Sequence, residues 1–179
     1  MSTYKIIFTG PVGAGKTTAI TSISDEPPVG TDEAATDMTR ERKQSTTVAM
    51  DYGVMHLEGD ERIYLYGTPG QERFNFMWDI LTTGGIGLVL LVDNTRPDPF
   101  VDMRFFLDSF KGFIAETKVV IGVTQMDIKA TPSIADYHKQ LQGSGLNPVI
   151  FEVDARARHD VSILVQGLLY SLDPGLTGA

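Results

Sequence analysis

Short apolar segments of strand length alternate along the chain with segments of helical periodicity. The strand-like segments are Tyr4–Phe8, Thr47–Leu57, Arg62–Tyr66, Gly87–Val92, Lys118–Thr124 and Val149–Val153. Runs such as GLVLLV at 87–92 contain no polar residue, which is typical of strands buried on both faces. Strands with such runs therefore belong to the interior of a layered fold rather than to a sheet with one solvent-exposed face.

Helical spacing characterises the segments between these strands. They are Lys16–Ser24, a segment that opens at Glu72, Pro99–Phe113, Ile134–Gln142 and Val161–Leu172. Alternating strands and helices favour a mostly parallel sheet, but the turn at Glu58-Gly59-Asp60 is short enough to join two antiparallel strands. We predict an α/β fold with a mostly parallel six-stranded sheet, one antiparallel edge hairpin and helices on both faces.

The length of 179 residues suits a single domain with one sizeable core. We find no internal repeat or interdomain linker and expect one domain over residues 1–173, followed by a loose tail at 174–179. The polar segment Asp25–Ser45 is long for a loop in a compact domain, and loops of that length are usually functional or mobile.

Charge and composition narrow the classes of partner. The net charge of −8 argues against nucleic acid and against an anionic membrane surface. With no cysteine, the chain has no disulfide, thiolate metal site, prenyl group or palmitoyl group. No apolar run approaches the roughly 20 residues that span a bilayer. We expect a cytoplasmic protein without a direct membrane anchor.

The segment GPVGAGKT at 10–17 fits the phosphate-loop pattern G-x-x-x-x-G-K-[ST] and lies between a predicted strand and a predicted helix. In such a loop, backbone amides converge on phosphate oxygens, the lysine reaches the β- and γ-phosphates, and the threonine hydroxyl binds Mg²⁺. The predicted nucleotide-binding residues here are Gly10, Gly13, Ala14, Gly15, Lys16, Thr17 and Thr18. The loop alone does not distinguish ATP from GTP.

Candidate base-reading residues follow the next two buried strands. Thr124-Gln125-Met126-Asp127 places an aspartate where it can accept hydrogen bonds from the ring N–H and the exocyclic amine of guanine. The segment Asp154-Ala155-Arg156 offers backbone amides, at Ala155 and Arg156, to the keto oxygen of guanine. An alternative interpretation is that residues 124–127 form only a strand-to-helix turn.

Taken in order, these segments resemble the Ras-like small GTPases over nearly the whole chain. The other matches are a switch threonine at Thr47 and the segment Pro69-Gly70-Gln71-Glu72. Gly10-Pro11, Asp51 and the lack of an aspartate before Pro69 make the chain similar to the bacterial MglA-related group. It departs from the usual motifs at Gln125, which stands for a lysine, and at Asp154, which stands for a serine.

The resemblance implies a G domain that binds GTP or GDP with Mg²⁺. Thr17 and Thr47 would bind the metal, Lys16 and Thr47 would contact the γ-phosphate together with the Gly70 amide, and Gln71 would orient the attacking water. Thr46 competes for the role of Thr47, and both threonines also simply suit the start of a strand.

Slow unaided hydrolysis is expected because Val12 replaces a glycine that is common in this loop, and because no motif fixes a catalytic arginine. Arg40 and Arg42 are candidates within the chain, although the favoured interpretation is that they are solvated loop charges. The resemblance implies a Roadblock-type regulator, while the downstream effector stays unidentified. Two alternatives remain open: a nucleotide-bound scaffold that does not hydrolyse, and a P-loop small-molecule kinase or ATPase, for which no arginine-rich lid is evident.

Gly67 occupies the position where Ras-like proteins place an aspartate near the metal. If the hairpin turn centres on Gly59, the antiparallel register puts Asp51 opposite Gly67, whereas a two-residue turn at Gly59-Asp60 would shift it by one. Opposed residues share a face of the sheet, so the Asp51 carboxylate would lean across the bare glycine toward Thr17 and the metal. The alternative is that Asp51 only forms part of a polar strand face.

Overall fold

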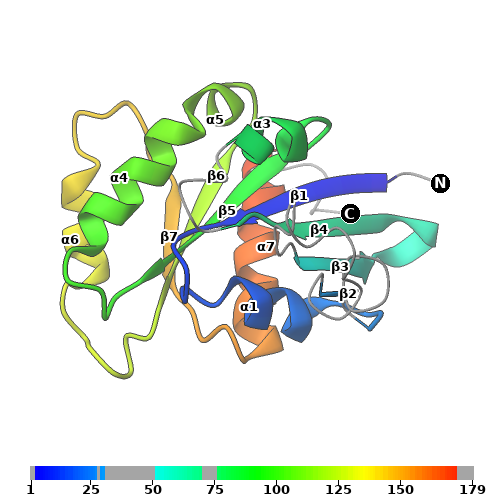
Figure 1. The fold of residues 1–179 in the computed structure, drawn as a ribbon, viewed down its shortest axis with the longest axis horizontal. Coiled ribbons are helices and arrows are strands. Elements are labelled where there is room, and N and C mark those ends of the chain that lie inside the picture. Colours follow the sequence, from blue (N-terminus) through cyan, green and yellow to red (C-terminus); the bar gives the residue numbers. More distant parts are fainter. Residues whose placement is uncertain (1–2, 28, 31–50, 70–75, 173–179) are drawn as a thin grey trace, which may run out of the picture.

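The computed structural model describes residues 3–27, 29–30, 51–69 and 76–172. Within these ranges one sheet runs through the molecule, with strands in the order β2-β3-β4-β1-β5-β6-β7 (Figure 1). The strands are β1 (Thr3–Thr9), β2 (Val29–Gly30), β3 (Asp51–His56), β4 (Arg62–Gly67), β5 (Gly87–Asp93), β6 (Val119–Thr124) and β7 (Val149–Glu152). Each of the adjacent pairs β4–β1, β1–β5, β5–β6 and β6–β7 is parallel.

The expected α/β fold with an antiparallel edge is confirmed. The antiparallel pairs are β3 with β4 and β2 with β3. The two-residue strand β2 extends the edge beyond the six strands that the apolar pattern predicts. A segment this short carries no periodicity, and the backbone pairing of Val29 with Tyr52 defines it instead.

Helices cover both faces of the sheet, as Figure 1 shows. They are α1 (Lys16–Ile23), α3 (Phe76–Thr82), α4 (Pro99–Ser109), α5 (Lys111–Glu116), α6 (Ile134–Gln140) and α7 (Arg158–Leu172). Alternate residues of the strands divide the core: Ile6 and Phe8 pack with α1 and α7, while Ile7 packs with α3 to α6. The parallel strands are thus buried on both faces, which explains their continuous apolar sequences.

One predicted helix is divided in two. The periodicity predicts a single helix over Pro99–Phe113, but α4 ends at Ser109 and α5 begins at Lys111. Phe110 between them has φ −103° and ψ 14°, and its ring is buried against Trp78 with centroids 4.9 Å apart. Packing of this aromatic side chain overrides the helical continuity of the sequence.

The β3–β4 hairpin has the register that the turn predicts. Gly59, with φ 74°, lies in the turn between the strands, and Asp51 pairs with Gly67. A Cβ on Gly67 would lie 3.2 Å from the Cβ of Asp51 and 3.1 Å from Cδ1 of Ile20. Glycine therefore leaves the space above this position to Asp51.

Several predicted residues lie outside the described ranges. They are Thr46, Thr47, Gly70, Gln71, Arg40, Arg42 and the tail 174–179. Their predicted roles stay predictions.

Leu164 of α7 tests the core between α7 and the sheet. Its side chain is fully buried, so replacement by alanine leaves a cavity and should lower the free energy of unfolding by about 2–5 kcal/mol. The neighbouring Ile163 is 37% exposed, and Ile163→Ala should cost less than about 1 kcal/mol. Chemical denaturation of both variants checks this; equal losses would show that α7 is not packed as described.

Candidate functional site

The phosphate loop connects β1 to α1 at the carboxyl edge of the sheet. Gly10 has φ 146°, and a Cβ there would collide with the backbone carbonyl of Leu91 in β5. Only glycine lets the loop leave β1 so close to the neighbouring strand. Gly15 precedes the first residue of α1 with φ 103°, so the loop leads directly into the positive end of the helix dipole.

Lys16 lies with its ammonium group folded back onto this loop. Its Nζ donates to the carbonyl oxygens of Gly10, at 2.6 Å, and Pro11, at 2.9 Å, and the residue is 8% exposed. Burial lowers the pKa of Lys16 to about 8, and the negative charge of Asp51 partly offsets this effect. The loop thus holds a cation whose charge is easily lost at alkaline pH.

Asp51 and Thr17 meet beside the loop. The Thr17 hydroxyl donates to Oδ2 of Asp51 at 2.6 Å, although the two residues come from α1 and from the edge strand β3. The same Oδ2 would lie 3.3 Å from a Cβ on Gly67, so the carboxylate leans across the glycine as the sequence predicts. A hydroxyl and a carboxylate oxygen form the type of oxygen pair that Mg²⁺ prefers.

The carboxyl end of β6 is tied to the phosphate loop by two side chains. Thr124 donates from its buried hydroxyl to the carbonyl of Ala14 at 2.8 Å. Gln125 has φ 62° and donates from Nε2 to the carbonyl of Gly13 at 3.3 Å. The segment after β6 is therefore fixed relative to the loop, and Gln125 makes a loop contact from the position where the Ras-like proteins that the sequence resembles have lysine.

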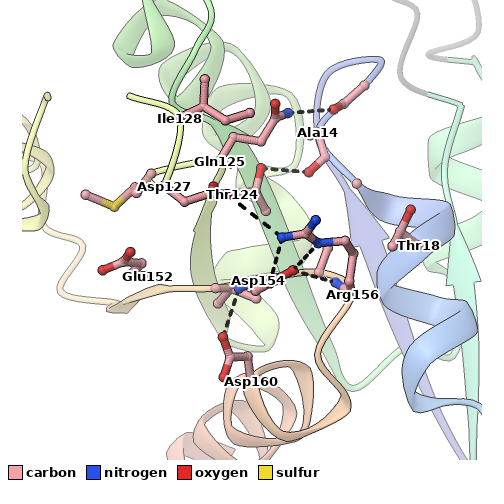
Figure 2. A pocket seen from close by; sticks show the side chains of 15 residues that line it. Ala14, Thr18, Thr124, Gln125, Asp127, Ile128, Glu152, Asp154, Arg156 and Asp160 are labelled. Carbon is pink, nitrogen blue, oxygen red and sulfur yellow. Dashed lines mark hydrogen bonds and ion pairs between the residues drawn. The ribbon is translucent and has the colours of Figure 1, made fainter. Parts of the chain in front are cut away.

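A pocket of about 830 Å³ opens between the phosphate loop and the ends of β6 and β7. It is lined by Gly13, Ala14, Gly15, Thr18, Thr124, Gln125, Met126, Asp127, Ile128, Glu152, Val153, Asp154, Ala155, Arg156 and Asp160. Figure 2 shows these lining side chains from the three segments around one space. Such a volume is in the range of small-molecule and cofactor sites.

The charged side chains Asp127, Asp154 and Arg156 lie close together at this pocket. Arg156 donates two hydrogen bonds to Asp154, from Nε to Oδ1 at 2.9 Å and from Nη2 to Oδ2 at 3.1 Å. The same Nη2 lies 3.9 Å from Oδ2 of Asp127. The Arg156 guanidinium lowers the pKa of the Asp154 carboxyl, chiefly through the side-chain hydrogen bonds. Asp160 fixes the segment after β7 by accepting a hydrogen bond from the Asp154 amide at 2.9 Å.

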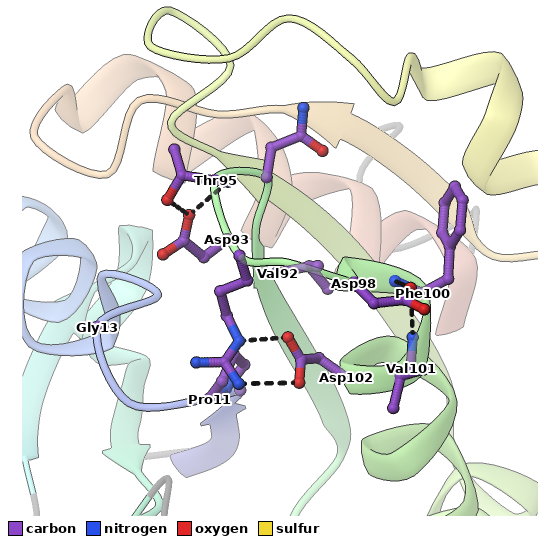
Figure 3. A network of polar contacts seen from close by, with 12 residues as sticks. Pro11, Gly13, Val92, Asp93, Thr95, Asp98, Phe100, Val101 and Asp102 are labelled. Atoms are coloured by element: carbon purple, nitrogen blue, oxygen red, sulfur yellow. Dashed lines mark hydrogen bonds and ion pairs between the residues drawn. The ribbon is translucent and has the colours of Figure 1, made fainter.

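A polar network shapes the exit from β5 (Figure 3). Asp93 accepts the amide and the hydroxyl of Thr95, at 2.8 Å and 2.6 Å, while Asp98 caps α4 by accepting two amides. Arg96 forms an ion pair with Asp102, and this contact raises the pKa of Arg96. The described contacts of the Arg96 guanidinium group are thus with a carboxylate of α4.

The segment that leads from β4 toward the predicted switch glutamine is also anchored. Thr68 is 2% exposed and shares a 2.7 Å hydrogen bond with the hydroxyl of Thr9. Trp78 donates from Nε1 to the carbonyl of Pro69 at 3.1 Å. These contacts were not predicted from the sequence, in which the single tryptophan that follows the P-G-Q segment was the available signal.

The structure brings together every described residue that the sequence assigns to nucleotide binding. Gly13, Ala14, Gly15, Thr18, Thr124, Gln125, Asp127, Ala155 and Arg156 all line the pocket. Gly10, Lys16 and Thr17 lie along the adjoining loop and the start of α1, and Asp51 reaches Thr17 from β3. Ile128, Glu152 and Asp160 also line the pocket but were not predicted from the sequence. Asp160 was detectable as the acidic residue in the first turn of the last helix, but nothing in the sequence marks the other two.

Within the described ranges, no three His, Asp or Glu side chains converge as a metal site. The same part of the chain contains no helix long and apolar enough to cross a membrane.

Comparison with protein families gives one match over more than half of the chain. The family described as "Conserved hypothetical ATP binding protein" matches residues 26–147. The matched range begins after the phosphate loop and includes the end of β6 with Asp127.

Individual proteins of the Ras-like type are similar over a longer range. The Ras-related protein RabC of Dictyostelium discoideum is 23% identical over 175 residues, covering 92% of this chain and 83% of that protein. Ras-related protein Rab-18-B of Danio rerio is 22% identical over 98% of this chain and 83% of its own length. The GTP-binding nuclear protein GSP1 of Encephalitozoon cuniculi is 24% identical, covering 90% and 72%.

Among solved structures, a bacterial selenocysteine-specific elongation factor, EF-Sec, has the same fold. Its TM-score is 0.66 at 20% identity, and the match covers 97% of this chain and 30% of that one. The shared fold is that of P-loop nucleoside triphosphatases. Membership of the MglA-related group stays a prediction.

The lowered pKa of Lys16 predicts a pH dependence for triphosphate binding. Lys16 is mostly protonated at pH 7 and mostly neutral at pH 9, and only the cation attracts phosphate oxygens. Affinity for a nucleoside triphosphate should therefore fall by up to about tenfold between these pH values. Equilibrium titrations across this range measure the change.

The matched control for this titration is Lys16→Met, which has no ammonium group. Its weaker affinity should change little with pH, apart from any titration of the nucleotide itself. A parallel decline in both proteins would contradict the assignment to Lys16.

Proposed function

The chain belongs to the family described as "Conserved hypothetical ATP binding protein", and we propose that it is a GTP-binding switch that hydrolyses GTP to GDP. The observation that carries the choice of guanine is the position of Asp127. Its carboxylate lies at the pocket, on a segment that Thr124 and Gln125 tie to the phosphate loop. Three Ras-like relatives support the same choice.

Hydrogen-bond chemistry separates the two purines at this carboxylate. Guanine offers two adjacent donors, its ring N–H and its exocyclic amine, and a carboxylate accepts both. Adenine offers one donor, its exocyclic amine, beside a ring nitrogen that is an acceptor. That nitrogen would face a carboxylate oxygen, which is also an acceptor, with no proton between them. A base edge left unpaired in this way binds less tightly than one whose donors are both accepted. The family description names ATP, so adenine is the competing ligand that the experiment below must exclude.

The phosphate groups would lie along the loop that precedes α1. There Lys16 would exchange its contacts with the carbonyls of Gly10 and Pro11 for phosphate oxygens. We assign Thr17 and Asp51 to Mg²⁺, together with Thr47, because the hydroxyl and carboxylate oxygens of the first two already meet at 2.6 Å. When bound, the metal neutralises charge on the phosphate oxygens, and it needs only one or two protein carboxylates.

The switch would act through the segments that approach the γ-phosphate. Thr47 and Gln71 keep the roles that the family resemblance implies, contact with the phosphate and orientation of water. We place the chain in the MglA-related group and its action in the cytoplasm. We also assign it a Roadblock-type regulator whose binding depends on the nucleotide. The hydrogen bond from Trp78 to the Pro69 carbonyl supports this proposal, because it fixes the backbone just before the segment that would change conformation with the nucleotide.

Slow turnover without a partner is part of the proposal. Val12 is 58% exposed on the phosphate loop, where a branched side chain narrows the approach of an arginine to the γ-phosphate. An arginine finger raises the rate of GTP hydrolysis by a factor on the order of 10³–10⁵, so without one the GTP-bound state should be long-lived.

Replacing Asp127 by asparagine tests the base assignment. The wild-type protein should bind GTP and GDP much more tightly than ATP in titrations with fluorescent nucleotides. Asp127→Asn should weaken guanine binding by at least about tenfold and favour xanthine nucleotides, because the side-chain donor of asparagine matches the second keto group of xanthine. Tighter binding of ATP than of GTP would overturn the proposal.

Single-turnover hydrolysis distinguishes the switch from a nucleotide-bound scaffold. Wild-type protein should convert bound GTP to GDP slowly, and Gln71→Ala should slow it further by an order of magnitude or more, because water loses its orienting group. Equal rates would remove Gln71 from the mechanism, and no conversion in the wild type would favour the scaffold.

A further inference from the structure

The most unusual feature of the base pocket is that its reading carboxylate already has a cationic partner. Arg156 Nη2 lies 3.9 Å from Oδ2 of Asp127, and both side chains line the pocket. Figure 2 shows the guanidinium group among the lining side chains, with dashed contacts to Asp154 and toward Asp127. A base that uses Asp127 must therefore compete with this arginine.

The arginine is held in this position from the other side. Asp154 accepts the Arg156 amide at 2.9 Å and also forms the two side-chain bonds to Nε and Nη2. Bidentate pairing fixes the plane of a guanidinium group and removes much of its rotational freedom. The remaining hydrogen of Nη2 is then available toward Asp127 without any rearrangement of the Asp154 pair.

We propose that Arg156 is a latch on the base pocket, which must leave Asp127 before the guanine edge can bind there. The inference rests on the proposed function, because it assumes that Asp127 reads the base. It explains why aspartate suits position 154: this carboxylate, which stands where Ras-like proteins have serine, orients the arginine. The latch lowers the apparent affinity by the fraction of molecules in which Asp127 is occupied.

The size of the effect follows from the exposure of the pair. The side chains of Arg156 and Asp127 are 73% and 68% exposed, so water screens their attraction strongly. Removing the latch should tighten GDP binding by about two- to fivefold and raise the association rate constant by a similar factor. The gain is small, and the experiment needs a control for the lost positive charge.

Arg156→Met keeps a long side chain but removes the charge and the donors, and Arg158→Met is the matched control. Arg158 is two residues further on, is ion-paired with Asp25, and is not among the residues that line the pocket. Both variants lose one positive charge, so the general weakening of attraction for an anionic nucleotide is common to them. Stopped-flow binding of fluorescent GDP to nucleotide-free protein should be faster and tighter for Arg156→Met than for Arg158→Met.

A second background shows whether the latch acts through Asp127. In Asp127→Asn protein, probed with a fluorescent xanthosine diphosphate, Arg156→Met should bind like Arg158→Met because no carboxylate is left to occupy. Equal gains in both backgrounds would overturn the latch, and so would weaker GDP binding by Arg156→Met than by Arg158→Met. Failure of the wild-type protein to bind GDP would instead overturn the proposed function, and it would be evident before any variant is made.

Discussion

The register of the β3–β4 hairpin is the constraint on which the account of this site depends. Because Asp51 pairs with Gly67, a carboxylate from the edge strand reaches Thr17 at the start of α1. A shift by one residue would move the Asp51 side chain to the other face of the sheet. The charge near Lys16, the proposed metal ligands and the packing of Ile20 beside Gly67 all depend on this pairing.

Beyond the hairpin, the site is assembled by contacts between the ends of separate strands. Thr124 and Gln125 fix the end of β6 to the phosphate loop, and Ser22 of α1 donates to the Ala155 carbonyl after β7 at 3.0 Å. These bonds join the predicted phosphate and base regions into one frame. The polar side of the pocket carries its own charge balance, with Arg156 between two carboxylates.

The sequence was informative where a short local signal determines the geometry. The phosphate-loop glycines, the turn at Gly59 and the buried strand patterns predicted the loop, the hairpin register and the sheet. The break at Phe110 and the position of the Arg156 guanidinium depend on side chains from other elements, and no local pattern encodes such packing. Likewise, the hydroxyl pair of Thr9 and Thr68 joins the end of β1 to the residue after β4, which are far apart in the chain.

The most direct test of the central claim moves the carboxylate across the hairpin. The dissociation rate of GTP would be measured with Mg²⁺ and with a chelator, in the wild type, in Asp51→Gly and in Asp51→Gly combined with Gly67→Asp. In Asp51→Gly, the factor by which Mg²⁺ slows GTP dissociation should be about 10- to 100-fold smaller than in the wild type. The double variant should regain most of this factor because the carboxylate returns to the same face of the sheet. Retention in Asp51→Gly equal to that of the wild type would contradict the account.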